Sequence, residues 1–152
     1  MPKESAGLLL YRRREEALEV LLVHPGGPFW AKKDAGAWTI PKGELAPGEA
    51  PLDAARREFR EETGQEVAGP FHALRPVRQA GGKTVYAWAV AGELDAAAIQ
   101  SNTFEMEWPP RSGRRRAFPE IDRAQWFALE EARRRINPAQ AALLDELAAQ
   151  DA

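Results

Sequence analysis

The sequence contains no cysteine, and histidine is rare, with only His24 and His72. The lack of cysteine excludes disulfides, thiolate metal sites and cysteine nucleophiles. It also leaves the redox compartment unreadable from cysteine usage. The two histidines do not have the spacing of metal ligands, so we interpret both as structural or surface residues.

Long apolar runs and an excess of one charge are also missing. No apolar run approaches the roughly 18 residues of a membrane span, and the N-terminus lacks the apolar core of a secretory signal. Lysine and arginine number 21 against 23 acidic residues, which gives a formal net charge of -2. That balance argues against a polybasic nucleic-acid binder. We therefore expect a soluble cytoplasmic protein with neither membrane nor nucleic acid as a partner.

The length and composition are those of one globular domain. The chain has 152 residues, of which 44% are hydrophobic and 29% charged, and both fractions are ordinary for a soluble protein. A domain of this size hides roughly two-thirds of the surface of its unfolded chain. We therefore expect a single domain over residues 1–152.

A helix with clear end signals is predicted from Pro51 to Glu62. Proline suits the first helical position, because its missing N–H has no partner there in any case. Gly64 follows the last turn and can take the left-handed conformation that ends a helix. The apolar residues of the segment recur at spacings of three and four, which gives one stripe facing the core, formed by Leu52, Ala55 and Phe59.

Strands are predicted on both sides of this helix. Short apolar runs indicate a strand pair at residues 5–11 and 18–23, and a third strand at 38–40. Gly81-Gly82 separates two further strands, 71–80 and 83–91, as in a hairpin. Residues 100–119 look irregular, a last strand follows at 124–128, and Asn137-Pro138 starts a second helix. The fold class is therefore α/β or α+β, with the sheet sandwiched between helices.

Three glutamates of the first helix carry the chemistry. At 100° per residue, Glu58, Glu61 and Glu62 share an arc of about 100°, away from the apolar stripe. Ionised carboxylates so close repel one another, and oxygen ligands at this density suit Mg²⁺ or Mn²⁺. For a Glu-Glu pair taken alone, a solvated acidic helix face is the simpler interpretation.

The wider spacing resembles the signature of the Nudix hydrolases. Seven fixed positions match, and chance gives such a match with probability on the order of one in 10⁸ per start site. They are Gly43, Glu49, Arg57, Glu58, Glu61, Glu62 and Gly64. One position departs, because the final apolar residue of the signature is Gln65 here. We expect Val67 to take over its packing role.

The resemblance implies an α/β fold, an α/β/α sandwich around a mixed sheet, and metal-dependent hydrolysis of a diphosphate linkage. By position it makes Glu58, Glu61 and Glu62 the ligands of Mg²⁺ or Mn²⁺, with the Gly43 carbonyl as a further ligand. The resemblance also implies a structural ion pair between Glu49 and Arg57, with two unrelated surface charges as the alternative.

The implied mechanism follows from charge. Metal ions neutralise the anionic pyrophosphate, lower the pKa of a bound water and align its attack on phosphorus. A carboxylate then accepts the proton of that water. Two residues are candidates, namely Glu58 and Glu120, which precedes the predicted last strand. A surface carboxylate is the alternative interpretation of Glu120.

Residues 38–43 and 83–88 resemble the branch of the family that hydrolyses dinucleoside polyphosphates such as diadenosine tetraphosphate. The substrate is then a small nucleotide, whose phosphates or base several residues are candidates to contact. These candidates are Lys42, Lys83, Tyr86 and two arginines of the basic run 111–116, Arg114 and Arg116. Trp30, Phe104 and Trp108 are candidates to stack on a base. Each also has a plain surface or packing interpretation.

Three functional hypotheses remain at this point. The first is a hydrolase of dinucleoside polyphosphates. The second is a pyrophosphohydrolase of the same family that takes nucleoside triphosphates, including oxidised ones, or nucleotide sugars. The third is a non-catalytic nucleotide-binding module. The intact set of Glu58, Glu61 and Glu62 argues against the third, because a binding module has little need of three mutually repelling carboxylates.

Overall fold

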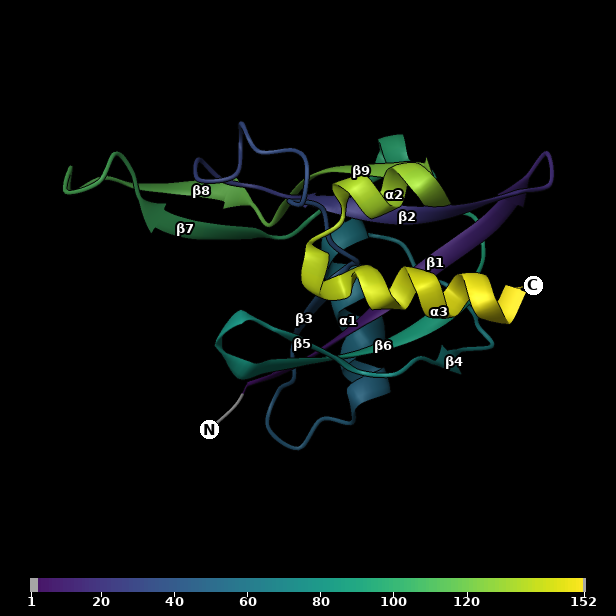
Figure 1. Cartoon of the computed structure of the whole chain (residues 1–152). Helices are drawn as coiled ribbons and strands as arrows, with labels where there is room; N and C mark the ends of the chain where they lie inside the picture. Colours follow the sequence, from purple (N-terminus) through teal and green to yellow (C-terminus); the bar gives the residue numbers. More distant parts are fainter. Residues whose placement is uncertain (1–2, 152) are drawn as a thin grey trace.

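Two long strands near the N-terminus form the middle of the sheet in the computed structural model, which describes residues 3–151 (Figure 1). Strands β1 (Glu4–Arg14) and β2 (Ala17–Pro25) are antiparallel neighbours joined at Glu15 and Glu16. Their apolar segments, from Leu8 to Leu10 and from Val20 to Val23, are fully buried. The predicted strand pair is therefore confirmed, covered on both faces.

The sheet is mixed, as predicted. Its strand order is β4 (His72–Ala73), β6 (Lys83–Ala91), β1, β2 and β9 (Ile121–Ala128). Strand β1 runs parallel to β6 and antiparallel to β2, so the chain must cross the sheet between them. Two short strands extend it, since β3 (Lys42–Glu44) pairs with β1 and β5 (Val77–Gln79) pairs with β6.

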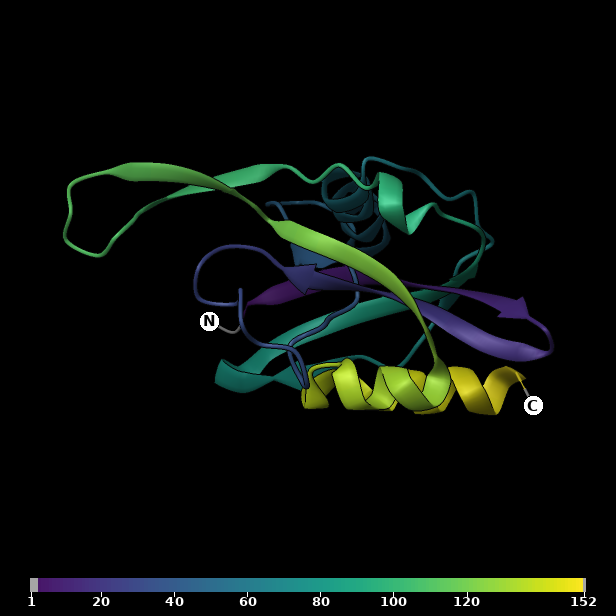
Figure 2. The same cartoon turned by 90° about the horizontal axis from the view of Figure 1, so that it is seen from above.

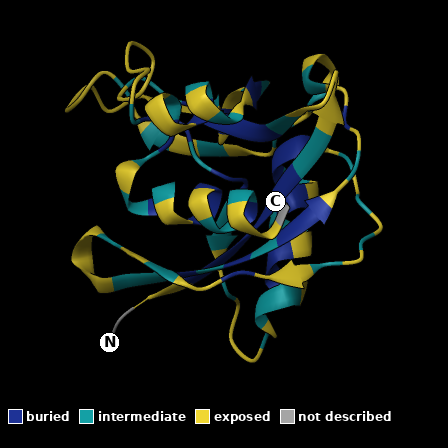
Figure 3. Cartoon of the chain, turned by 45° about the vertical axis from the view of Figure 1, so that its right-hand side comes forward, coloured by how far each residue is buried: buried dark blue, intermediate teal, exposed yellow. Residues whose placement is uncertain are grey.

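Helices cover both faces of this sheet (Figure 2). Helix α1 (Pro51–Thr63) packs on one face around Phe59, with Leu8 and Val90. Helices α2 (Leu129–Arg135) and α3 (Ala141–Asp151) cover the other face. Buried residues follow the sheet and the inner sides of the helices, while the outer sides are exposed (Figure 3). The predicted sandwich is confirmed.

The ends of α1 are those that the sequence predicted. Pro51 occupies the first turn, and Gly64 ends the helix with φ 74°, its N–H bonded to the Arg60 carbonyl at 2.8 Å. Val67 packs on the cluster around Phe59, as expected for the departure from the signature. The amide of Gln65 instead donates to the Asp95 carbonyl at 3.2 Å.

Two of the predicted strands are wrong in their bounds. Residues 38–40 make only isolated bridges, Trp38 with Ile136 and Thr39 with Val23, and the paired strand lies later, at β3. Gly7 explains the shift, because a Cβ there would lie 2.5 Å from the Pro41 carbonyl oxygen. The segment before β3 therefore passes close to β1 at Pro41, and it pairs with β1 only from Lys42 onward. Residues 71–80 form two short strands, β4 and β5, rather than one.

The prediction that residues 100–119 are irregular is also wrong. They contain β7 (Thr103–Glu107) and β8 (Arg115–Pro119), a two-stranded hairpin that projects from the main sheet (Figures 1 and 2). Its apolar residues alternate with exposed ones, but Pro109 and Pro110 and the arginine run obscure that short pattern. Helix α2 was also not predicted from the sequence.

Among residues 3–151, no helix has the length and apolarity needed to cross a membrane.

Candidate active site

A polar cavity of about 400 Å³ lies where α1 meets β3 and the start of β9. Five glutamates from three parts of the chain reach it. Three of them come from α1, Glu44 comes from β3, and Glu120 comes from the junction of β8 and β9. The lining residues are Lys42, Gly43, Glu44, Glu58, Glu61, Glu62, Asn102 and Glu120. We call this cavity the carboxylate pocket.

Gly43 lets the backbone of β3 approach the Glu58 side chain. A Cβ atom at position 43 would lie 2.1 Å from Glu58 Cδ and 2.2 Å from its Oε2. Real contacts of that kind do not occur, so a side chain at position 43 would displace the carboxylate. The glycine of the signature is therefore explained by close packing of β3 against α1.

Arg57 fixes the orientation of the acidic side chains. Its Nε and Nη2 donate to the two carboxylate oxygens of Glu49, each at 2.9 Å. Its Nη1 donates to Glu58 at 2.8 Å and to Glu61 at 3.1 Å. Hydrogen bonds from Arg57, with one from the Ala46 backbone N–H, lower the pKa of Glu49 to about 2. Such forked pairing is specific to arginine.

Burial has the largest effect on the pKa of two glutamates of the pocket, Glu58 and Glu62. Glu62 is 7% exposed, and burial, followed by the neighbouring charge of Glu58, raises its pKa to about 9. Burial also raises the pKa of Glu58, and Glu61 and Glu120 add to this effect. Lys42 opposes the shift at Glu62, while its own pKa is lowered by burial. Keeping Glu58 and Glu62 ionised together therefore requires further positive charge in the pocket.

The donor set fits a hard divalent cation. Carboxylate groups from α1 and from Glu120 line one small cavity, and the negative charge of Glu120 raises the pKa of both Glu58 and Glu62. Oxygen-rich, anionic surroundings of this kind suit Mg²⁺ or Mn²⁺. Within residues 3–151, no group of three acidic or histidine side chains is arranged around a common metal position. Arg57 bonds to Glu58 and Glu61 here.

Other predicted substrate contacts lie outside the carboxylate pocket. Lys83 approaches its rim, with Nζ 3.9 Å from Glu44. Tyr86 donates its hydroxyl to Glu4 at 2.5 Å. Arg114 and Arg116 are exposed on the β7–β8 hairpin and do not line the pocket. The structure thus brings Lys42 to the carboxylates, but not the other four.

The histidines have the structural and surface placements that the sequence predicted. His24 is fully buried at the end of β2, and His72 is exposed on β4.

One residue of the carboxylate pocket, Asn102, was not predicted from the sequence. Its N–H donates to the Glu61 carbonyl at 2.8 Å, and its carbonyl accepts from Glu120 N–H at 2.9 Å. Asn102 thus connects α1 to Glu120. The sequence around Asn102 gives no sign of this role, because Glu61 and Glu120 are distant in sequence and both are bonded to Asn102 through backbone atoms.

Comparison with known proteins agrees with this geometry. A family model described as NUDIX domain matches residues 1–147. The asymmetrical bis(5'-nucleosyl)-tetraphosphatase of Mus musculus is 34% identical over 100 residues, which cover 58% of this chain and 64% of that protein. The Sus scrofa enzyme of the same name is 37% identical over 70 residues, 42% of this chain and 44% of that protein. The chain therefore spans less than two-thirds of the curated relatives it matches.

Solved structures share the fold. A binary complex of C. elegans Ap4A hydrolase superimposes with a TM-score of 0.67 at 24% identity, over 95% of this chain and 96% of that one. The NUDIX domain of Shewanella oneidensis NrtR, complexed with ADP ribose, gives a TM-score of 0.66 at 18% identity, over 99% and 88%. At such identities the similarity concerns the fold alone.

Proposed function

Because this chain belongs to the NUDIX family, we propose that it hydrolyses a diphosphate linkage in a nucleoside polyphosphate, with dinucleoside polyphosphates preferred. One observation carries the reaction class. Glu58, Glu61, Glu62 and Glu120 share one pocket with Lys42 beside them. The similarity to asymmetrical bis(5'-nucleosyl)-tetraphosphatases supports the choice of substrate.

In this proposal Glu58, Glu61 and Glu62, with the Gly43 carbonyl, hold a divalent cation, Mg²⁺ or Mn²⁺. When bound, such a cation neutralises phosphate charge and lowers the pKa of a coordinated water. Arg57 keeps the carboxylates aligned through Glu49, which it holds by a two-point contact. The pair Glu49–Arg57 is thus a positioning element and does not touch substrate.

Proton transfer falls to one of two carboxylates. Glu58 and Glu120 line the pocket from different elements, and the raised pKa of Glu58 suits a group that accepts a proton. Glu120 reaches the pocket from the junction of β8 and β9, bonded through its backbone to Asn102. Comparing the pH profiles of Glu58→Gln and Glu120→Gln variants assigns the base.

Cationic side chains contribute to phosphate binding in this proposal. Lys42 lines the pocket and is half-buried, so water screens its charge on a phosphate less than it would at the open surface. Lys83 is one step further out, at the rim formed by Glu44. Arg114 and Arg116 on the hairpin are then available only to phosphates that extend beyond the pocket.

A substrate panel tests the proposal. The protein is incubated with Mg²⁺ and, separately, diadenosine tetraphosphate, a nucleoside triphosphate, an oxidised one and a nucleotide sugar, and products are resolved by anion-exchange chromatography. We expect diadenosine tetraphosphate to give ATP and AMP. If it stays intact while a triphosphate loses pyrophosphate or the nucleotide sugar is cleaved, the substrate assignment is wrong. Binding without turnover of any compound indicates a non-catalytic module.

A further inference from the structure

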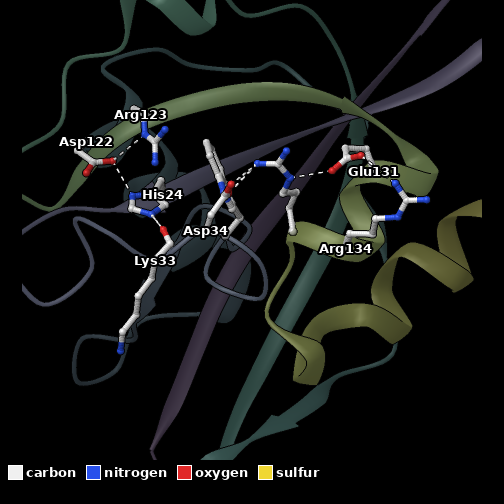
Figure 4. Close-up of polar contacts among 9 residues, drawn as sticks. His24, Lys33, Asp34, Asp122, Arg123, Glu131 and Arg134 are labelled. Atoms are coloured by element: carbon white, nitrogen blue, oxygen red, sulfur yellow. Dashed lines mark hydrogen bonds and ion pairs between the residues drawn. The ribbon is translucent and has the colours of Figure 1, made fainter.

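A fully buried histidine lies at the end of β2. The two nitrogens of the His24 ring contact different parts of the chain (Figure 4). Its Nδ1 lies 2.8 Å from Asp122 Oδ1 on β9, and its Nε2 lies 2.6 Å from the Lys33 carbonyl oxygen. The ring therefore connects the start of β9 to the loop that follows β2.

Both neighbours of the His24 ring accept hydrogen bonds. A backbone carbonyl has no hydrogen to donate, so Nε2 carries a proton. An ionised Asp122 also only accepts, in which case Nδ1 carries a second proton. The same Asp122 oxygen lies 3.7 Å from Nε of Arg123, and this guanidinium attracts negative charge there. The contacts thus favour a doubly protonated ring beside an ionised carboxylate.

A shift in the pairing of β2 with β9 directs Asp122 to this ring. His24 pairs with Arg123, but Pro25, the next residue, pairs with Ile121. Asp122 is thus the extra residue of β9 at this step. A bulge of this kind redirects side chains and is common beside active sites. Here it follows the β8–β9 junction, which lines the carboxylate pocket.

The backbone of Glu120, at that junction, is held on both sides. Its N–H donates to the Asn102 carbonyl at 2.9 Å, and its carbonyl accepts from the Gly26 N–H at 2.8 Å. Gly26 is two residues after His24. Asp122 is two residues after Glu120. The contact between His24 and Asp122 therefore closes a small ring of contacts around the backbone that carries Glu120.

The other contact of the His24 ring holds the far end of the loop. Lys33, whose carbonyl meets Nε2, is followed by Asp34, which accepts from Trp38 Nε1 at 2.8 Å. Between its ends the loop lies against the β7–β8 hairpin, where a Cβ on Gly27 would lie 2.9 Å from Phe104 Cζ. Loop and junction are therefore held through the same imidazole ring.

We propose that His24 is a positioning residue for the reaction: as an imidazolium paired with Asp122, it fixes Glu120 at the carboxylate pocket. The inference rests on the proposed function, in which Glu120 is one of two candidate bases. A base must lie within hydrogen-bond reach of the proton that it takes, and a misplacement of about 1 Å can cost about 10²-fold in rate. His24 does not line the pocket, so it acts through Glu120 and does not touch substrate.

Two amide substitutions separate the contacts of the ring. In His24→Asn the side-chain NH₂ takes the place of Nδ1 and can donate to Asp122, whereas in His24→Gln it takes the place of Nε2 and can donate to Lys33. We expect kcat of His24→Gln to fall about 10²-fold with KM almost unchanged, because Glu120 is displaced. His24→Asn should retain most of the activity. His72→Gln, at the exposed histidine, is the matched control.

A third variant, Asp122→Ala, avoids the core, because the Asp122 side chain is 31% exposed. We expect its kcat to fall as in His24→Gln. Asp145→Ala is its control, since Asp145 pairs with Arg133 at 3.1 Å on the exposed side of α3. In a Glu120→Gln background neither His24→Gln nor Asp122→Ala should lower kcat further. Equal losses in the two His24 variants, or an undiminished further loss without the Glu120 carboxylate, overturn the inference.

The proton positions are measurable directly, because the chain has only two histidines. In ¹⁵N NMR spectra of histidine-labelled protein, the signals of His24 are those that remain in His72→Gln. At pH 7 we expect a proton on both ring nitrogens of His24. A ring with a proton on one nitrogen alone overturns the ion pair.

The inference and the proposed function can fail separately. Hydrogen exchange at the Gly26 and Glu120 amides needs no substrate, and we expect both amides to lose protection in Asp122→Ala. If the unmodified chain cleaves no nucleotide but these amides lose protection, the proposed function fails while the arrangement fixed by His24 stands. If a nucleotide is cleaved and kcat of His24→Gln and Asp122→Ala is unchanged, this inference fails while the proposed function stands.

Discussion

The substitution Gly43→Ala separates activity from stability in this protein. The new Cβ would lie 2.1 Å from Glu58 Cδ, so the carboxylate must withdraw by roughly 1.3 Å to reach the 3.4 Å of an ordinary contact. A misplacement of about 1 Å in a catalytic group can cost about 10²-fold in rate. We therefore expect kcat/KM to fall about 100-fold, which corresponds to about 2.7 kcal/mol of transition-state stabilisation.

Stability is expected to respond differently. Gly43 is not among the described residues with positive φ, so alanine fits its backbone, and replacing a strand glycine changes stability by about 1 kcal/mol or less. The clash involves the end of a flexible side chain, which can move aside. Thermal unfolding should therefore give a melting temperature within a few degrees of the unmodified chain.

The assay is steady-state hydrolysis of the preferred substrate alongside thermal unfolding. Gly92→Ala is the matched control, since its Cβ would meet only the side chains of Leu10 and Val67. These lie away from the part of β1 that pairs with β3. A double-mutant cycle with Glu58→Ala identifies the route of the effect. If Gly43→Ala lowers activity by the same factor when the Glu58 carboxylate is already absent, the loss does not act through Glu58 and the reasoning is refuted.

Three further predictions concern the core and the site. Gln140→Leu should destabilise the fold by about 1–3 kcal/mol and lower the melting temperature, because the buried Ile40 N–H then loses its 3.0 Å acceptor. Because Arg57 lowers the Glu49 pKa to about 2, the pair stabilises the fold above pH 4.5 and loses that effect as pH falls toward 2; Glu49→Gln should flatten this part of the unfolding profile. Chelation by EDTA should abolish hydrolysis until Mg²⁺ is restored, and Glu61→Gln should cut turnover by orders of magnitude with the fold intact.

Each of these has a contrary result. An unchanged melting temperature for Gln140→Leu would show that the Ile40 N–H finds another partner. An acid-unfolding profile that Glu49→Gln leaves unaltered would remove the pair from the pH response. Activity that survives EDTA, or near-normal turnover of Glu61→Gln, would exclude the ligand assignment. Glu66→Gln is the control for the last variant, since Glu66 is exposed and contacts only Arg60 among the interactions described.

Local segments were predictable where their periodicity is strong. The helix from Pro51 was predicted within one residue of its observed end, because proline, the apolar stripe and Gly64 agree. The β7–β8 hairpin was not predicted, since its alternation covers only a few residues and is interrupted by Pro109 and Pro110. The strand predicted at 38–40 lies instead at β3, because the close approach at Gly7 lets the chain pair with β1 only after Pro41.

The acidic half of the site follows from the order of residues along the chain. Glu58, Glu61 and Glu62 lie within two turns of one helix, so helical geometry alone brings them together. The other half depends on the folded arrangement, in which Asn102 and Glu120 complete the pocket. Those contacts join residues many positions apart. They require the pairing of β2 with β9, which the backbone hydrogen bonds of the sheet establish and which no local pattern records.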